Sequence, residues 1–219
     1  VVIEDVVGGG PSVVASGPTI ASDLGARAKA IIEDSGLSDL LPPAIVASAN
    51  RWSHATSPPS MVTVTAAGPE LAAEAAAAAI DVGRAIVVPE ALAGDVGPAV
   101  EAFVSRSPDR TVVGFGETTV RVTSSQPGGR NQHAALIAAR TLAGSNRVFG
   151  ALASDGRDGT TDAAGAIVDG STWERIRRTG IDAEAAIADF AAHHALEAVG
   201  ATLITGRTGT NVADLWVCG

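Results

Sequence analysis

Short apolar runs of strand length alternate with alanine-rich amphipathic stretches of helix length along most of this chain. The run at residues 148–153 is short and bounded by turn residues, whereas the stretch at 132–142 repeats apolar residues at helical spacing. Because strands separated by helix-length segments usually pair in parallel, the pattern predicts an α/β fold: a largely parallel or mixed sheet with helices on both faces. The predicted strands are 1–7, 61–65, 84–89, 111–115, 117–123, 148–153, 202–205 and 214–218, and the predicted helices run from residue 22 or 23 to about 36, from 42 or 43 onward, and over 69–82, 97–105, 132–142 and 183–199.

A polar segment rich in serine and proline divides this pattern at residues 53–60. Its sequence, Ser-His-Ala-Thr-Ser-Pro-Pro-Ser, offers little that a core could bury. We therefore expect a linker at 53–60 between a part formed by residues 1–52 and a C-terminal α/β domain formed by residues 61–219.

Composition and charge narrow the classes of function. Apolar residues make up 46% of the chain, enough for a sizeable core, and no apolar run approaches the roughly 20 residues that cross a bilayer. The net charge of -9 argues against binding to a phosphate backbone, so we expect neither a nucleic-acid nor a membrane partner. The single cysteine, Cys218, cannot form an internal disulfide, which fits a cytoplasmic location. The chain has no initiator Met and no signal-peptide pattern, and we expect it to begin within a longer protein.

One glycine-rich stretch, Gly128-Gly129-Arg130-Asn131-Gln132, stands at the start of a predicted helix. Glycines let a ligand approach the backbone, the helix start offers unpaired N–H groups, and an arginine can hold phosphate or carboxylate with two parallel hydrogen bonds. The G-K-[ST] ending of a Walker A loop is absent. A tight structural turn with Arg130 in an ion pair explains the same spacing equally well.

A second polar loop, residues 154–162, carries Asp155, Asp158 and Asp162 directly after a predicted strand. Carboxylates of this kind suit Mg²⁺, whose remaining positions are filled by phosphate and water. The alternative is a set of Asx turns that caps the next segment. A third loop, 206–211, again combines glycine, arginine and hydroxyl groups, so the three loops together suggest an anionic ligand with a metal.

The histidines point less clearly to chemistry. His193 and His194 are adjacent in a predicted helix and face different ways, which argues against a paired metal site. His133 follows the glycine-rich stretch, where it could assist a ligand or cap the helix.

Read in order, the polar loops resemble the glycerate 2-kinase family, whose C-terminal part is called the MOFRL domain and whose members are often labelled hydroxypyruvate reductase. The resemblance covers nearly the whole chain and is weakest from about residue 40 to 110. The matching stretches are "EDVVGGGPSVVASGPT" (4–19), "GETTVRV" (116–122), "GGRNQ" (128–132), "SDGRDGTTDAAGAIVDG" (154–170) and "GRTGTNVADL" (206–215).

The resemblance implies ATP- and Mg²⁺-dependent phosphorylation of D-glycerate at its 2-hydroxyl, in a cleft between two α/β domains. It also implies that residues 1–52 are the remnant of an N-terminal α/β domain and that the MOFRL-like region covers about 111–219. Arg130 would be the catalytic residue that binds substrate or phosphate. Asp155 and Asp158 are our choice of metal ligands, because theirs is the most acidic loop nearby. The substrate- or phosphate-binding residues would be Gly128, Gly129, Asn131, Gln132, Thr208 and Asn211.

The chain also departs from the family pattern. Family members have a longer N-terminal part with a glycine-rich loop and a functional lysine, whereas the one lysine here, Lys29, lies in no matching motif. Gly9-Gly10 stands where the family has an acidic pair, and Phe190-Ala191-Ala192 where it has a polar Asn-Asp-Ser stretch.

Two hypotheses follow. The chain is the C-terminal portion of a glycerate 2-kinase, inactive without the missing N-terminal domain, or it is a diverged, non-catalytic domain that binds a metabolite or a partner. A reductase is disfavoured, because no G-x-G-x-x-G dinucleotide motif occurs in the sequence.

Overall fold

The computed structural model describes residues 24–51, 68–80, 85–106 and 110–219. The chain divides into two compact units, residues 1–65 and 66–219. In the first unit, helices α1 (Leu24–Asp34) and α2 (Pro43–Arg51) pack against each other, and both lie where the sequence predicted a helix. The predicted linker 53–60 and the predicted strands 1–7 and 61–65 lie outside the described residues.

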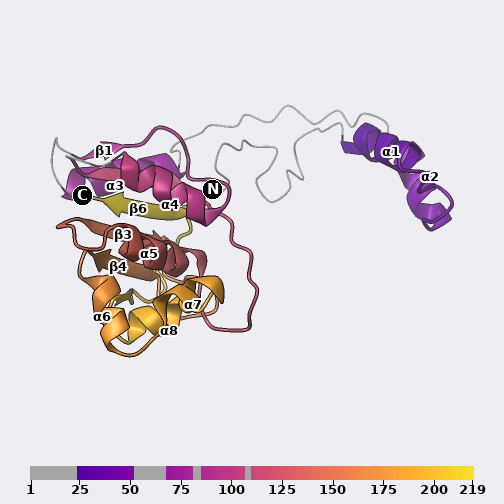
Figure 1. The fold of residues 1–219 in the computed structure, drawn as a ribbon. Coiled ribbons are helices and arrows are strands. Elements are labelled where there is room, and N and C mark those ends of the chain that lie inside the picture. The colour runs from indigo at the N-terminus through magenta and orange to yellow at the C-terminus, as the bar shows by residue number, and fades with distance from the viewer. Residues whose placement is uncertain (1–23, 52–67, 81–84, 107–109) are drawn as a thin grey trace. The chain divides into compact units, whose positions relative to one another are not determined.

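A six-stranded sheet forms the framework of the second unit (Figure 1). The strands lie in the order β1-β2-β6-β3-β4-β5. Only β1 and β2 pair in parallel, and every other neighbouring pair is antiparallel. The prediction of a mixed sheet is therefore confirmed, and its largely parallel alternative is wrong. The strands are β1 (Ile86–Val87), β2 (Val112–Gly116), β3 (Val148–Ala153), β4 (Gly165–Asp169), β5 (Thr202–Leu203) and β6 (Asp214–Cys218).

Two features of the chain path account for the antiparallel pairs: the insertion of β6 and the short connection between β3 and β4. The C-terminal strand β6 inserts between β2 and β3 and runs antiparallel to both. Strands β3 and β4 are joined by the loop 154–164, which contains no crossover helix of the kind that parallel neighbours need. Sequence reasoning identified only the loop 154–162 in this region and predicted no strand after it, so it missed β4. The predicted strand 117–123 is also wrong, since this segment contributes only an isolated bridge between Thr119 and Asp95.

Helices cover both faces of the sheet, as predicted. Alternate residues of β2 point to opposite faces: Val112 belongs to the main core, where Phe103 of α4 and Leu136 of α5 also lie, and Val113 points away from it. Helix α3 packs against β1, β2 and β6. Helix α5 lies between α4 and a group of three short helices (Figure 1). The helices of this unit are α3 (Gly68–Ile80), α4 (Val96–Ser105), α5 (Arg130–Thr141), α6 (Thr172–Arg178), α7 (Ala183–Ala188) and α8 (Ala192–Glu197).

The predicted helix 183–199 is in fact two helices, α7 and α8. The helical conformation breaks at Phe190, whose φ of 55° lies in the left-handed region that non-glycine residues rarely adopt. The buried Phe190 ring stacks on His133 of α5, with 4.8 Å between the ring centroids. This contact accompanies the break and brings the chain after α7 against the start of α5.

Three aromatic rings form the centre of the core between the sheet and α4. Trp216 of β6 and Phe149 of β3 contact Phe103 of α4 edge to face, with ring centroids 5.8 and 6.2 Å from it. Trp216 is completely buried, although its indole N–H needs a hydrogen-bond acceptor. That acceptor belongs to the polar site described below.

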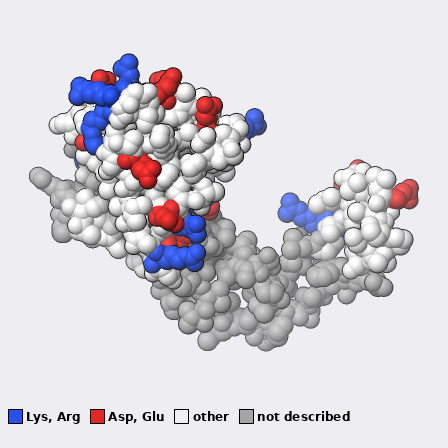
Figure 2. Space-filling view, turned by 90° about the horizontal axis from the view of Figure 1, so that it is seen from below, with Lys and Arg blue, Asp and Glu red and all other residues white. Residues whose placement is uncertain are grey.

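The surface carries charges of both signs side by side (Figure 2). Several of them pair, including Arg106 with Glu90 and Arg140 with Glu184. Among the described helices, none combines the length and apolar character needed to cross a membrane.

Close contact between β3 and β4 predicts a sharp difference between two glycines. A Cβ added to Gly165 would lie 1.9 Å from the carbonyl oxygen of Ala151, whereas one added to Gly150 would lie 3.6 Å from Ile167 Cγ1. We expect Gly165→Ala to lower the free energy of unfolding by about 1–3 kcal/mol, because rigid backbone must move, and Gly150→Ala to change it by less than about 0.5 kcal/mol. Urea denaturation followed by circular dichroism measures both; equal effects of the two substitutions would contradict this packing.

Candidate functional site

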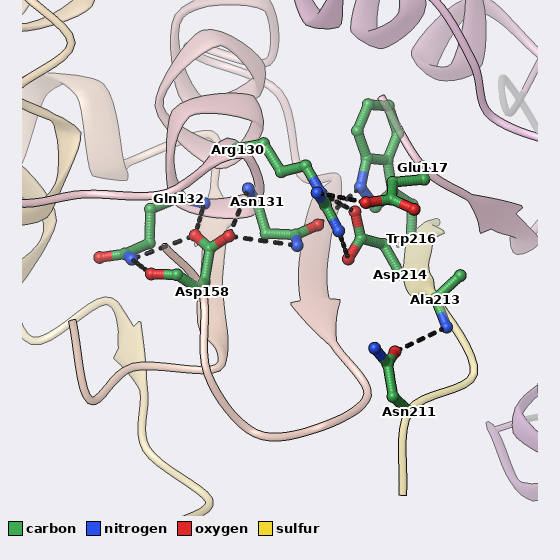
Figure 3. A network of polar contacts seen from close by, with 9 residues as sticks. All are labelled: Glu117, Arg130, Asn131, Gln132, Asp158, Asn211, Ala213, Asp214 and Trp216. Atoms are coloured by element: carbon green, nitrogen blue, oxygen red, sulfur yellow. Dashed lines mark hydrogen bonds and ion pairs between the residues drawn. The ribbon is translucent and has the colours of Figure 1, made fainter. Parts of the chain in front are cut away.

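The carboxylate of Asp158 lies against the first turn of α5 (Figure 3). Its Oδ1 accepts hydrogen bonds from the backbone N and Nδ2 of Asn131, at 3.1 and 3.3 Å. Its Oδ2 accepts from the backbone N and Nε2 of Gln132, at 2.8 and 3.1 Å. The anion at this helix start is therefore a side chain of the protein itself, in the place where an N-cap side chain would act.

Two glycines make room for this contact. Gly129 is the N-cap residue of α5, and a Cβ on it would lie 2.2 Å from Cγ of Asp158. Gly159 has a φ of 63°, and a Cβ there would lie 2.1 Å from the carbonyl oxygen of Gly128. These glycines are needed for the approach of one loop to the other, whatever ligand binds nearby.

Arg130 is held by two carboxylates. Its Nε and Nη2 donate to Oδ2 and Oδ1 of Asp214, at 2.6 and 3.1 Å, and its Nη1 lies 2.6 Å from Oε1 of Glu117. Burial raises the pKa of the Asp214 carboxyl, and the hydrogen bonds from Arg130 act in the opposite direction. The charge of this arginine is thus already balanced within the protein.

Asn131 and Gln132, both fully buried, connect the core to the far side of the site. Trp216 donates its indole Nε1–H to Oδ1 of Asn131 at 3.0 Å. Gln132 Nε2 also donates to the hydroxyl of Thr161 at 2.9 Å, and Gln132 Oε1 lies 2.7 Å from Nδ1 of His193. Because an amide oxygen only accepts, His193 donates from Nδ1. One hydrogen-bonded network therefore extends from β6 to α8.

Three of the predicted site residues lie apart from this network. Asp155 Oδ1 accepts from the backbone N of Arg157 at 2.9 Å, which is an Asx turn. The backbone N of Thr208 donates to the carbonyl oxygen of Asp155 at 3.2 Å, and Oδ1 of Asn211 accepts from the backbone N of Ala213 at 3.1 Å. These contacts stabilise the loops 154–156 and 206–213.

The two aspartates chosen as metal ligands do not form a metal site by themselves. Asp158 is 2% exposed, and both of its oxygens are occupied by N–H donors. Burial raises the pKa of its carboxyl, against the effect of those hydrogen bonds. Across the part of the chain that the structure describes, no group of three or more acidic, His or Cys residues could hold a metal. Metal binding by Asp155 and Asp158 stays a prediction that these contacts do not favour.

A pocket of about 410 Å³ opens beside Arg130. Sequence reasoning did not identify Arg157 or Phe190, which line it, or Glu117 and Asp214, which hold Arg130. The position of Asp214 was detectable, because it alternates with Trp216 on the core face of β6 and a carboxylate there needs a cation. The pocket is lined by Val120, Val122, Ser124, Ser125, Gln126, Gly128, Gly129, Arg130, Ala153, Arg157, Asp158, Gly159, Thr160 and Phe190.

His133 lies one turn into α5, behind the wall that Phe190 forms. Burial lowers the pKa of its imidazole to about 4, against a weaker opposing effect of Asp95. Within the described structure its Nδ1 has no hydrogen-bond partner. The ring is therefore neutral at pH 7, and protonating it opposes folding.

The fold and the site define a mixed α/β domain in which a glycine turn, an internally capped helix and two arginines border a small pocket. Residues 110–214 match the sequence model of the MOFRL family, which assigns this part of the chain to that family. The site residues from Arg130 to Asp214 all fall within the matched region.

Comparison with individual proteins gives the same relationship over a longer stretch. The chain is similar to the glycerate 2-kinase of Pyrococcus horikoshii, with 40% identity over 125 residues that make up 55% of this chain and 28% of the relative. It is 33% identical to a putative hydroxypyruvate reductase of Agrobacterium vitis over 98% of this chain and 53% of the relative. The crystal structure of glycerate kinase from Thermotoga maritima superimposes with a TM-score of 0.84 and 29% identity over 99% of this chain and 55% of that one. Nearly all of this chain aligns with these last two proteins, but it spans only about half of their length, in their C-terminal half.

Replacing the capping carboxylate should weaken the site. In Asp158→Asn an NH₂ group would face N–H donors of Asn131 or Gln132, so we expect a loss of about 1–3 kcal/mol in the free energy of unfolding. Asp162→Asn, an exposed change in the same loop, is the matched control and should stay within about 0.5 kcal/mol. Urea denaturation at pH 7 tests the pair, and an unchanged Asp158→Asn midpoint would refute the capping role.

Stability should fall on acidification because of His133. The unfolded chain takes up a proton near the ordinary pKa of 6.5, but the folded ring does so only near 4, so folding loses up to about 3 kcal/mol between these values. His133→Leu should remove this part of the pH dependence, whereas His194→Gln, at an exposed position, should retain it. Parallel curves of unfolding free energy against pH for the parent and His133→Leu would show that the ring is not buried in neutral form.

Proposed function

We propose that the chain is the C-terminal part of a glycerate 2-kinase, which transfers phosphate from ATP to the 2-hydroxyl of D-glycerate to give 2-phosphoglycerate. One observation carries the proposal: the glycine-rich loop 128–132 and the acidic loop 154–162, both family motifs, border one pocket of a size suited to a small ligand. The names of the glycerate kinase relatives supply the reaction.

In this proposal Arg130 forms one wall of the substrate site. A guanidinium has five N–H donors, and three contacts go to Asp214 and Glu117, which leaves donors for a carboxylate or phosphate oxygen. Asn131 and Gln132 fix the start of α5 through Asp158. Gly128 and Gly129 line the pocket without side chains, so that a substrate can approach the backbone.

Thr208 and Asn211 support the site from the loop 206–213, and Asp155 does so through the turn that it forms. ATP use follows from the kinase family, and in this proposal part of the nucleotide contacts would come from residues of the longer relatives that this chain does not span. Mg²⁺ would arrive with the ATP phosphates, because the described residues provide no cluster of ligands for it. Catalysis would then need an equivalent of that N-terminal half.

One observation favours the second candidate, a diverged non-catalytic domain. The two features expected to receive an anion, Arg130 and the start of α5, are both matched by carboxylates of the chain itself. Such a domain would bind a metabolite or a partner without turnover.

Binding and turnover together separate the candidates. We expect the 219-residue chain to bind D-glycerate in isothermal titration calorimetry. Arg130→Lys, which keeps the charge and loses the two parallel bonds to Asp214, should weaken binding about tenfold, and Arg140→Lys on the surface should not. ³¹P NMR should detect 2-phosphoglycerate only when the N-terminal half of a glycerate kinase relative is supplied. Absence of D-glycerate binding would contradict the kinase proposal, and consumption of NADH with hydroxypyruvate would point to the reductase.

A further inference from the structure

The pocket contains two arginines whose electrostatic situations differ. Arg130 is paired with Asp214 and Glu117, and the buried carboxylate of Asp158 lies nearby. Arg157 also lines the pocket, and among the described residues it has no carboxylate partner for its guanidinium. A ligand that enters the pocket therefore meets one arginine whose charge is already balanced and one whose charge is not.

Hydrogen bonds within its own loop orient Arg157, which is an exposed residue. Its backbone N–H donates to Oδ1 of Asp155, and its Nε donates to the carbonyl oxygen of Thr161 at 3.2 Å. The next residue, Asp158, is anchored to α5 by four hydrogen bonds. With Nε occupied, the two terminal NH₂ groups remain available to a ligand.

The walls around Arg157 suit an oxyanion with a short carbon skeleton. Hydroxyl and amide groups come from Ser125, Gln126 and Thr160, and the apolar part of the lining includes Val122 and Phe190. Such a combination of one unbalanced cation, polar donors and a small apolar surface is what recognition of a small organic anion requires.

We propose that Arg157 is the residue that binds the negatively charged group of the ligand, a carboxylate or a phosphate, through its two terminal NH₂ groups. In this assignment Asp155 and Asp158 are positioning residues: Asp155 accepts from the backbone of Arg157, and Asp158 holds the start of α5. The location of the site rests on the proposed function. The new element is that Arg157 binds the ligand's charged group, in addition to the contacts proposed for Arg130.

Calorimetric titration of the 219-residue chain with three probes tests the assignment. D-glycerate carries only a carboxylate, inorganic phosphate only a phosphate, and 2-phosphoglycerate carries both. We expect Arg157→Ala to weaken binding of at least one single-anion probe and of 2-phosphoglycerate about tenfold or more, and Arg157→Lys to restore part of it. Arg140→Ala, an exposed arginine with its own carboxylate partner, is the matched control and should bind as the parent does.

The salt dependence of binding separates a contact with the ligand from a structural effect. If Arg157 neutralises the anion, NaCl should weaken binding to the parent more steeply than binding to Arg157→Ala, at an unchanged melting temperature. The probe that responds identifies the group: D-glycerate for the carboxylate, inorganic phosphate for the phosphate.

Two results would overturn the assignment: parent-like affinities in Arg157→Ala for all three probes, or no binding of any probe to the parent. Loss of phosphate binding in Arg157→Ala, with no D-glycerate binding in the parent, would support Arg157 and contradict the glycerate proposal. If Arg157→Ala binds all probes as the parent does while Arg130→Lys binds D-glycerate more weakly, the glycerate proposal is supported and the role of Arg157 is contradicted.

Discussion

The structure of the site depends on the contact between the Asp158 carboxylate and the first turn of α5. The N-cap residue, Gly129, has no side chain, so the first N–H groups of the helix need an acceptor from elsewhere in the chain. Asp158 supplies it, and the absence of a Cβ at Gly129 lets it approach. The contact joins two loops that lie about thirty residues apart in sequence, and it holds both of them at the same pocket. It also occupies the position at the helix start that a phosphate would take.

The same contact couples the site to the core. Asn131 binds Asp158 with its amide N–H₂ and receives the indole N–H of Trp216 on its oxygen, and Trp216 is the largest side chain at the centre of the aromatic cluster. Asp214, two residues earlier on β6, holds Arg130. A buried polar group that loses its hydrogen-bond partner lowers the free energy of unfolding. A substitution at the pocket should therefore lower stability, and a substitution at Trp216 should disturb the start of α5.

The sequence predicted most elements of the fold but not the pairing of its strands. Start and stop residues located α1 and α2, and apolar stretches of helix length located α3 to α5. It failed between 183 and 199, where Phe190 interrupts an alanine-rich run that carries no breaker residue. The parallel arrangement was inferred from helix-length spacing, and β6 overturns it by inserting between β2 and β3. In the site, the motifs identified the loops that meet. Which charge pairs with which could not be predicted, since the partners Arg130 and Asp214 are brought together only by the fold.

Phe190 shows how the departure from the family pattern at 190–192 bears on the pocket. A left-handed residue after a helix is usually Gly or Asn, and here the backbone N–H groups of Phe190 and Ala191 donate to the carbonyl oxygens of Ile187 and Ala186, as in a Schellman motif. The ring is buried against His133, which is itself kept neutral by burial, and Phe190 also lines the pocket. A polar residue at this position would give the ligand another hydrogen-bond partner, whereas Phe190 gives it an apolar wall. In the proposed site the anionic group of the ligand would then be the strongest point of recognition, and selection would depend on the different charge balance of Arg130 and Arg157.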